Sequence, residues 1–141
     1  MPNPKLAARI LNQIQARPHQ HDQSAWMGGA LSLSPDADLT APAHCGTTLC
    51  VAGYAAHFTG HTLQADVRSA SGTTVAYKVE GEALKVSEVA QAELGLSTDD
   101  ADVLFDPGTT QIEVLAALEQ LADGATSIDW PAVGALALTT S

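Results

Sequence analysis

Residues 47–60 read TTLCVAGYAAHFTG, and we expect this stretch to organise the fold. From Cys50 to Ala56 the segment is almost wholly apolar and consists mainly of small residues. A helix that is apolar on every side is a buried helix. Gly53, which has no Cβ, would allow another element to approach closely. We therefore predict a central helix over 47–60.

Apolar residues recur at helical spacing on both sides of this segment. Asn3 suits an N-cap and Pro18 ends the first pattern, while Gly95, Ser97 and Thr110 are typical of helix ends and starts. The pattern predicts helices over 3–17, 86–95, 98–106 and 110–123. An apolar tail over 128–138 is either a last core element or a segment that faces a partner, including a second copy of the chain.

Residues 62–80 alternate between apolar and polar side chains, as one strand pair does. Leu63, Ala65 and Val67 would face the core, and so would Val75, Tyr77 and Val79, with a turn at Ser69–Gly72. Residues 18–45 are irregular, with a short element expected around Trp26 and 31–33, and Trp26 anchoring the loop. We predict a single domain over 1–141 of the α+β class. It is mostly helical, with four to five helices around the small-residue central helix and one β-hairpin packed on the side.

Charge is distributed unevenly along the 141 residues, whose formal net charge is −10. Ten acidic residues and no Lys, Arg or His lie between Val86 and Ser141. Such a surface repels phosphate backbones, which argues against direct nucleic-acid binding. It either keeps the protein in solution or docks a partner with a basic surface. The partner-binding residues predicted on this basis are Asp99, Asp100, Asp102 and Asp106, together with Trp26.

Cysteine and histidine concentrate in and before the central segment. Thiolate and imidazole are zinc ligands, so Cys45, Cys50, His57 and His61 form a candidate tetrahedral site. On one helix, Cys50, His57 and His61 would share a face. Alternatively, Cys45 is a nucleophile near a helix N-terminus with His44 or His57 as base, or it pairs with Cys50 in a disulfide. The remaining reading has Cys50 in the core and the histidines on the surface, with no cofactor.

Other motifs are weaker or absent. His19, His21 and Asp22 could bind a divalent metal ion, or form a solvated loop. The acidic cluster at 99–106 lacks the spacing of a calcium loop. No Walker loop, GxGxxG, GxSxG or HExxH motif is present in the sequence. No apolar run approaches the roughly 20 residues that span a bilayer. We see no signal peptide, so we expect a cytoplasmic protein.

The chain resembles a known group of proteins in the motif Cys45-Gly46-Thr47-Thr48-Leu49-Cys50-Val51-Ala52-Gly53-Tyr54-Ala55. With the helical pattern that continues to Phe105, it resembles a group of small proteins from actinobacteria and their phages. The resemblance covers about half of the chain, and the histidines are not part of the pattern. That group has no assigned activity, so the resemblance implies provenance and not mechanism.

These observations favour a non-enzymatic intracellular protein that binds other proteins. Together with the acidic C-terminal half, the provenance that the resemblance implies favours an accessory phage product that contacts a host protein through its acidic helical face. The alternative is a small zinc-binding protein or thiol enzyme that uses Cys45, Cys50, His57 and His61.

Overall fold

A computed structural model describes residues 2–23, 25–30, 32–44, 46–65, 74–77 and 84–140. These residues form an α+β fold that is mostly helical, as predicted. The helices are α1 (Pro4–Ala16), α2 (Val51–Phe58), α3 (Val86–Leu94), α4 (Thr98–Leu104), α5 (Gln111–Ala122) and α6 (Trp130–Thr140). The strands are β1 (Met27–Gly28), β2 (Ser32–Leu33), β3 (Thr48–Leu49), β4 (Thr62–Ala65), β5 (Thr74–Tyr77) and β6 (Leu84–Lys85). Two 3-10 turns, Pro18–Gln20 and Pro42–His44, lie between them.

Helix α2 is central and buried, but it is shorter than the predicted 47–60. Its residues from Val51 to His57 are all buried. It begins late because Thr48 and Leu49 form β3, which pairs with β1. Cys50 is therefore the N-cap, and its sulfur accepts a hydrogen bond from the Gly53 amide at 3.4 Å. The helix ends at Phe58.

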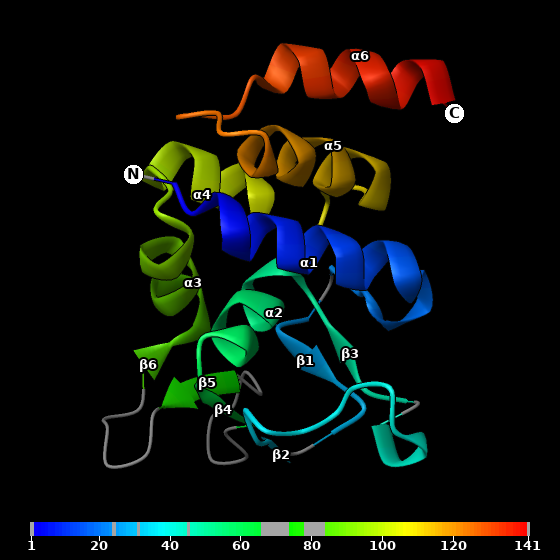
Figure 1. Cartoon of the computed structure of the whole chain (residues 1–141), viewed down its shortest axis with the longest axis vertical. Helices are drawn as coiled ribbons and strands as arrows, with labels where there is room; N and C mark the ends of the chain where they lie inside the picture. The colour runs from blue at the N-terminus through cyan, green and yellow to red at the C-terminus, as the bar shows by residue number, and fades with distance from the viewer. Residues whose placement is uncertain are drawn as a thin grey trace.

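Helix α3 packs beside α2, and α1, α4, α5 and α6 lie above it in layers (Figure 1). Helix α1 packs against both α5 and α2, and α6 packs against the opposite side of α5. The predicted caps at Asn3, Gly95, Ser97 and Thr110 are confirmed, because each forms the expected terminus. Asn3 also donates from its backbone amide to Leu94 O at 2.9 Å, which joins the start of α1 to the end of α3.

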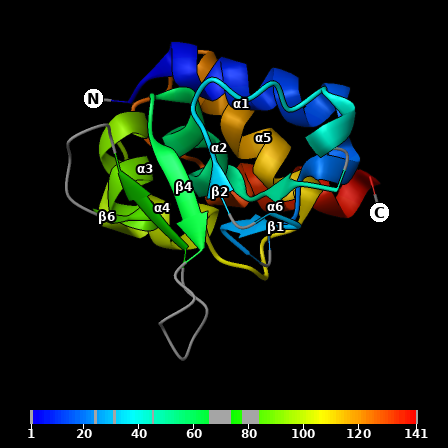
Figure 2. The ribbon, with the colours of Figure 1, turned by 90° about the horizontal axis from the view of Figure 1, so that it is seen from below.

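The strands lie below the helices and form two antiparallel sheets among the described residues (Figures 1 and 2). One pairs β1 with β3, and the other has the order β2-β4-β5-β6. The predicted hairpin is thus confirmed as β4–β5, extended by a strand on each side. Strands β1 and β2 are the short element expected within 18–45. The turn predicted at Ser69–Gly72 lies outside the described residues.

The predicted facing of the second hairpin strand is wrong. The register pairs Leu63 with Ala76, so these two residues lie on one face. Neither has any exposed surface. The strand therefore turns the small Ala76 towards the core, although Val75 and Tyr77 were expected there.

The apolar tail forms α6, which begins at Trp130. Val133 and Ile128 are buried against the rest of the protein, whereas Leu136 is 51% exposed. The tail is therefore a packed element that leaves an apolar residue on its outer side. None of the helices in the described residues is long and apolar enough to cross a membrane.

Candidate binding site around Trp26

A groove of about 410 Å³ lies where the Trp26 loop meets α3 and α4. We call it the Trp26 groove. Apolar and acidic side chains from three separate parts of the chain share its lining, which consists of Trp26, Ser87, Gln91, Ala101, Asp102, Phe105, Asp106 and Pro107. Three of the five predicted partner-binding residues, Trp26, Asp102 and Asp106, are thus brought together.

The backbone of Trp26 rests directly on the start of α2. A Cβ atom placed on Gly53 would collide with the carbonyl oxygen of Trp26. The Cys50 sulfur lies 4.0 Å from the same oxygen. The next residue, Met27, pairs with Leu49 through the β1–β3 ladder. Gly53 therefore permits the close approach that positions the loop, as the small-residue pattern predicted.

A chain of side-chain amides around His21 attaches the start of this loop to α4 and α5. One His21 ring nitrogen, Nε2, lies 2.9 Å from Gln23 Oε1, and the other, Nδ1, lies 3.1 Å from Gln111 Nε2. The Gln23 amide in turn donates to Leu104 O at the end of α4. Burial lowers the pKa of His21, which favours its neutral form.

This network gives the His19, His21 and Asp22 motif a structural role. Both ring nitrogens of His21 have amide partners, so neither is directed at a metal ion. Within the described ranges, no group of three or more His, Cys, Asp or Glu side chains is placed to hold a metal ion.

The acidic residues of α4 and of the turn after it separate into exposed and buried side chains. Asp99 and Asp102 on α4 and Asp106 in the turn are exposed. Asp106 also accepts a hydrogen bond from the Gly108 amide at 2.7 Å, which fixes the turn that carries Pro107. Two carboxylates thus lie at the edge of the Trp26 groove, while Asp99 does not line it.

Asp100 does not fit the expectation of an exposed docking residue, because only 9% of it is accessible. Its Oδ2 accepts from the Ile128 amide at 3.1 Å, and its Oδ1 accepts from the Trp130 indole nitrogen at 3.0 Å. Both oxygens are therefore used to attach the start of α6 to α4. The residue is positioned by the helix that Ser97 caps.

The structure does not bring the proposed zinc ligands together on one helical face. Helix α2 ends at Phe58, so His61 lies beyond it, where its Nδ1 is 3.1 Å from Thr59 Oγ1. The expectation of surface histidines is also wrong for His57 and His61, which are each 4% exposed. His57 belongs to the buried stretch of α2 from Val51 to His57, and His61 follows the turn at its end. Cys45 lies outside the described residues.

Cys50 has the environment of a structural thiol. It is 1% exposed, and its sulfur is engaged as the N-cap of α2. Burial raises the pKa of its thiol to about 11, so the side chain stays protonated at neutral pH. A protonated, enclosed sulfur is a poor nucleophile.

The sequence analysis did not identify Phe105 and Pro107 as residues of this groove. Phe105 is largely buried, and its remaining surface lines the groove. Comparison with protein-family models, curated proteins and solved structures gives no match.

Proposed function

We propose that the protein is a non-catalytic binding protein that takes up a basic segment of a partner protein in the Trp26 groove. The observation that carries this proposal is the convergence of Trp26, Phe105, Asp102 and Asp106 on one cavity of about 410 Å³. Its lining combines aromatic surface with two carboxylates and, among the described residues, contains no Lys or Arg.

This composition suits the side chain of Lys or Arg. Such side chains have an apolar stem and a charged end. The stem can lie on Trp26, Phe105 and Pro107, where the cation also interacts with an aromatic face. The charged end then reaches Asp102 or Asp106 at the rim. Complementary charge across the interface accelerates association and disfavours acidic partners.

Fluorescence titration with an octa-arginine peptide tests this proposal. An octa-glutamate peptide, which has the opposite charge, is the control. The double variant Asp102→Asn/Asp106→Asn should weaken binding about tenfold, since each exposed ion pair contributes up to roughly 0.7 kcal/mol. Trp26→Ala should weaken it further. The matched control is Asp99→Asn/Asp123→Asn, which removes the same charge from exposed positions outside the groove.

Equal losses in the two double variants would show that the peptide responds to net charge alone, and the proposal would then fail. Charge reversal at Asp99, Asp100 and Asp102 together is a poorer test. Asp100 holds α6, so that variant changes the fold along with the charge.

In this proposal the partner is a host-cell protein with a basic surface, and the protein is an accessory phage product that acts in the cytoplasm. The resemblance of its central motif to small actinobacterial and phage proteins supports this assignment. A further partner in the proposal is a second copy of the chain, for which the exposed Leu136 of α6 is the contact. Size-exclusion chromatography of Leu136→Gln tests that contact.

A further inference from the structure

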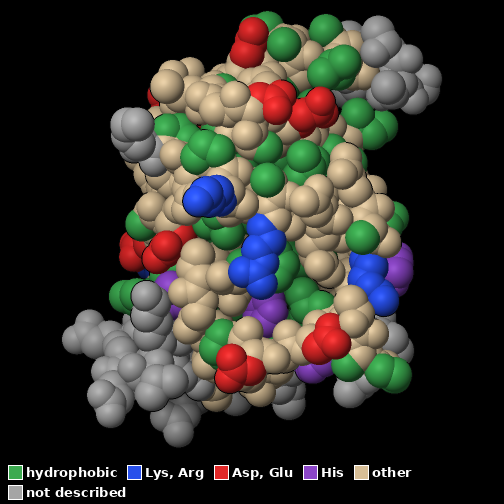
Figure 3. All heavy atoms as spheres, in the orientation of Figure 1, with side chains coloured by type: hydrophobic (Ala, Val, Ile, Leu, Met, Phe, Trp, Pro, Cys, Tyr) green, Lys and Arg blue, Asp and Glu red, His purple; other side chains and the backbone are tan. Residues whose placement is uncertain are grey.

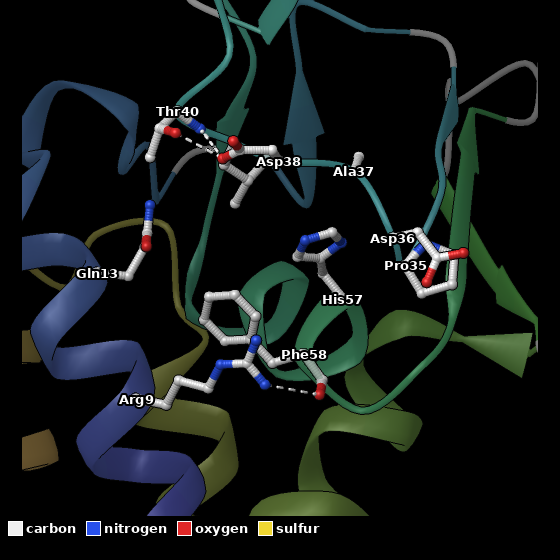
Figure 4. Close-up of a pocket in the computed structure, with 10 residues that line it drawn as sticks. Arg9, Gln13, Pro35, Asp36, Ala37, Asp38, Thr40, His57 and Phe58 are labelled. Carbon is white, nitrogen blue, oxygen red and sulfur yellow. Dashed lines mark hydrogen bonds between the residues drawn. The ribbon is translucent and has the colours of Figure 1, made fainter.

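A second cavity, of about 300 Å³, lies between α1, residues 35–40 and the end of α2 (Figure 4). It is separate from the Trp26 groove, and the two share no lining residue within the part of the chain that the structure describes. Hydrogen-bond donors line one side of this cavity, and hydrogen-bond acceptors line the other. In Figure 3, the face that carries α1 shows Lys and Arg side chains across its middle, with Asp and Glu side chains above and below.

The α1 side of the cavity supplies hydrogen-bond donors. Arg9 and Gln13 are one helical turn apart on α1 and both line the cavity. The Arg9 guanidinium lies 4.2 Å from the Phe58 ring centre and donates one hydrogen bond to Phe58 O at 3.4 Å. A guanidinium has five N–H donors, so most remain for a ligand. The Gln13 amide nitrogen is buried and has no hydrogen-bond partner among the described residues.

The opposite side supplies acceptors. His57 is 4% exposed, and its Nδ1 is buried with no partner in the described part of the chain. Burial lowers the pKa of His57, and the charges of Arg9 and His44 lower it further. The backbone of Ala37 acts in the other direction. A neutral imidazole has one acceptor nitrogen, so His57 can accept a hydrogen bond from a ligand.

Two exposed carboxylates lie on either side of His57 (Figure 4). Asp36 and Asp38 lie on the loop that covers His57 (Figure 4). Asp38 is fixed by Thr40, whose amide and hydroxyl donate to its Oδ1 at 2.9 and 2.6 Å. These bonds hold the pKa of Asp38 below its usual value, so it carries a negative charge at neutral pH.

A ligand with matching groups would satisfy the unpartnered buried polar atoms on both sides. We propose that this cavity binds a free α-amino acid, with its carboxylate towards Arg9 and Gln13 and its ammonium towards His57 and one of the two loop carboxylates. A simple anion would meet two carboxylates, and a simple cation would meet the guanidinium. The volume is at the lower end of the range for small-molecule sites, which suits a ligand of this size.

Isothermal titration calorimetry with individual amino acids tests the proposal on the full chain. The probes are glycine, alanine, serine, valine and leucine, each compared with its N-acetyl and methyl-ester derivatives. At least one free amino acid should bind saturably. Blocking either of its charged groups should weaken binding about tenfold or more, because charge-assisted hydrogen bonds are lost.

Two variants assign the binding to this cavity. Arg9→Gln should weaken binding about tenfold or more, whereas Lys5→Gln should not change it. Lys5 is exposed on the same helix, carries the same charge and does not line the cavity. Thermal unfolding followed by circular dichroism checks that each variant is folded. If Arg9→Gln does not fold, Gln13→Leu replaces it, with the same loss expected.

Absence of saturable binding for all five amino acids would overturn the proposal and leave the unpartnered atoms to water. Equal affinity for the free and the blocked forms would also overturn it, and so would binding that both Arg9→Gln and Gln13→Leu retain.

Discussion

Replacing Asp100 with Ala should weaken the attachment of α6 far more than any other loss of an acid on α4. The carboxylate accepts hydrogen bonds from the Ile128 amide and the Trp130 indole nitrogen, at 3.1 and 3.0 Å. The Ile128 bond is buried. Because water cannot easily reach that amide, the substitution leaves a donor without a partner.

The magnitude follows from these two donors. A buried donor without a partner costs about 1–3 kcal/mol, and the half-buried indole nitrogen adds about 1 kcal/mol. We expect the free energy of unfolding to fall by about 2–4 kcal/mol relative to Asp102→Ala. Asp102 is exposed on the same helix, so the comparison cancels the change in net charge. Gln120 still holds Asp129 through two hydrogen bonds, so α6 should loosen and not leave entirely.

Urea unfolding monitored by circular dichroism measures the global difference, and hydrogen exchange at the Ile128 amide measures the local one. Asp100→Ala should lower both the midpoint and the protection of that amide. A difference below about 1 kcal/mol between the two variants, with unchanged protection at Ile128, would refute the structural role of Asp100.

Three further changes test other parts of the fold. Gly53→Ala should destabilise the protein by about 1–3 kcal/mol in urea unfolding, because the new methyl group displaces the Trp26 carbonyl; an increase in stability would contradict the close approach. Gly134→Ala in α6 has open space around the new Cβ and should raise the free energy of unfolding by up to about 1 kcal/mol, as a gain in helix propensity predicts; a loss would show that the space is filled. Since burial lowers the pKa of His57 in the folded state, the unfolded chain takes up its proton first as pH falls below 6.5. Stability should then decline as pH falls below 6.5, and His57→Gln should reduce the slope more than His19→Gln does, which urea titrations at each pH would show.

The sequence predicts the helices well because their signals are local. The caps at Asn3, Ser97 and Thr110 act within one turn, and each is confirmed. The start of α2 depends instead on a distant strand. Leu49 pairs with Met27 across 22 positions, and nothing in residues 47–60 reveals that partner. Local patterns therefore predict that a helix exists. They do not predict that strand pairing takes up its first residues.

The predicted facing of β5 is wrong for a similar reason. Alternation over residues 75–79 allows two phases, and larger apolar side chains suggest the wrong one. Pairing with Leu63 and burial select Ala76, the small residue. A small residue occupies a fully enclosed position because the neighbouring element lies close to it. That distance depends on the whole fold and not on the local sequence.

The candidate sites also divide into features that local sequence predicts and features that depend on distant contacts. Charge and composition selected Trp26, Asp102 and Asp106, and these residues share a groove. The acidic pattern could not distinguish Asp100, because its role depends on donors 28 and 30 residues further along the chain. His57 drew attention as a ligand from its spacing to cysteines. Its position beside Arg9 and Asp38 depends on the packing of α1 and the 35–40 loop against α2.

Helix α2 links both proposed sites through two residues one turn apart. Gly53 lets the Trp26 loop rest on the helix. His57 supplies a polar atom to the second cavity, for which we propose amino-acid binding. The two residues contact different segments, so their substitutions should separate the two activities. Gly53→Ala should weaken octa-arginine binding without abolishing amino-acid binding, and His57→Gln should do the reverse. Loss of both activities in both variants, with the fold retained, would mean that the sites share one conformational element and are not independent.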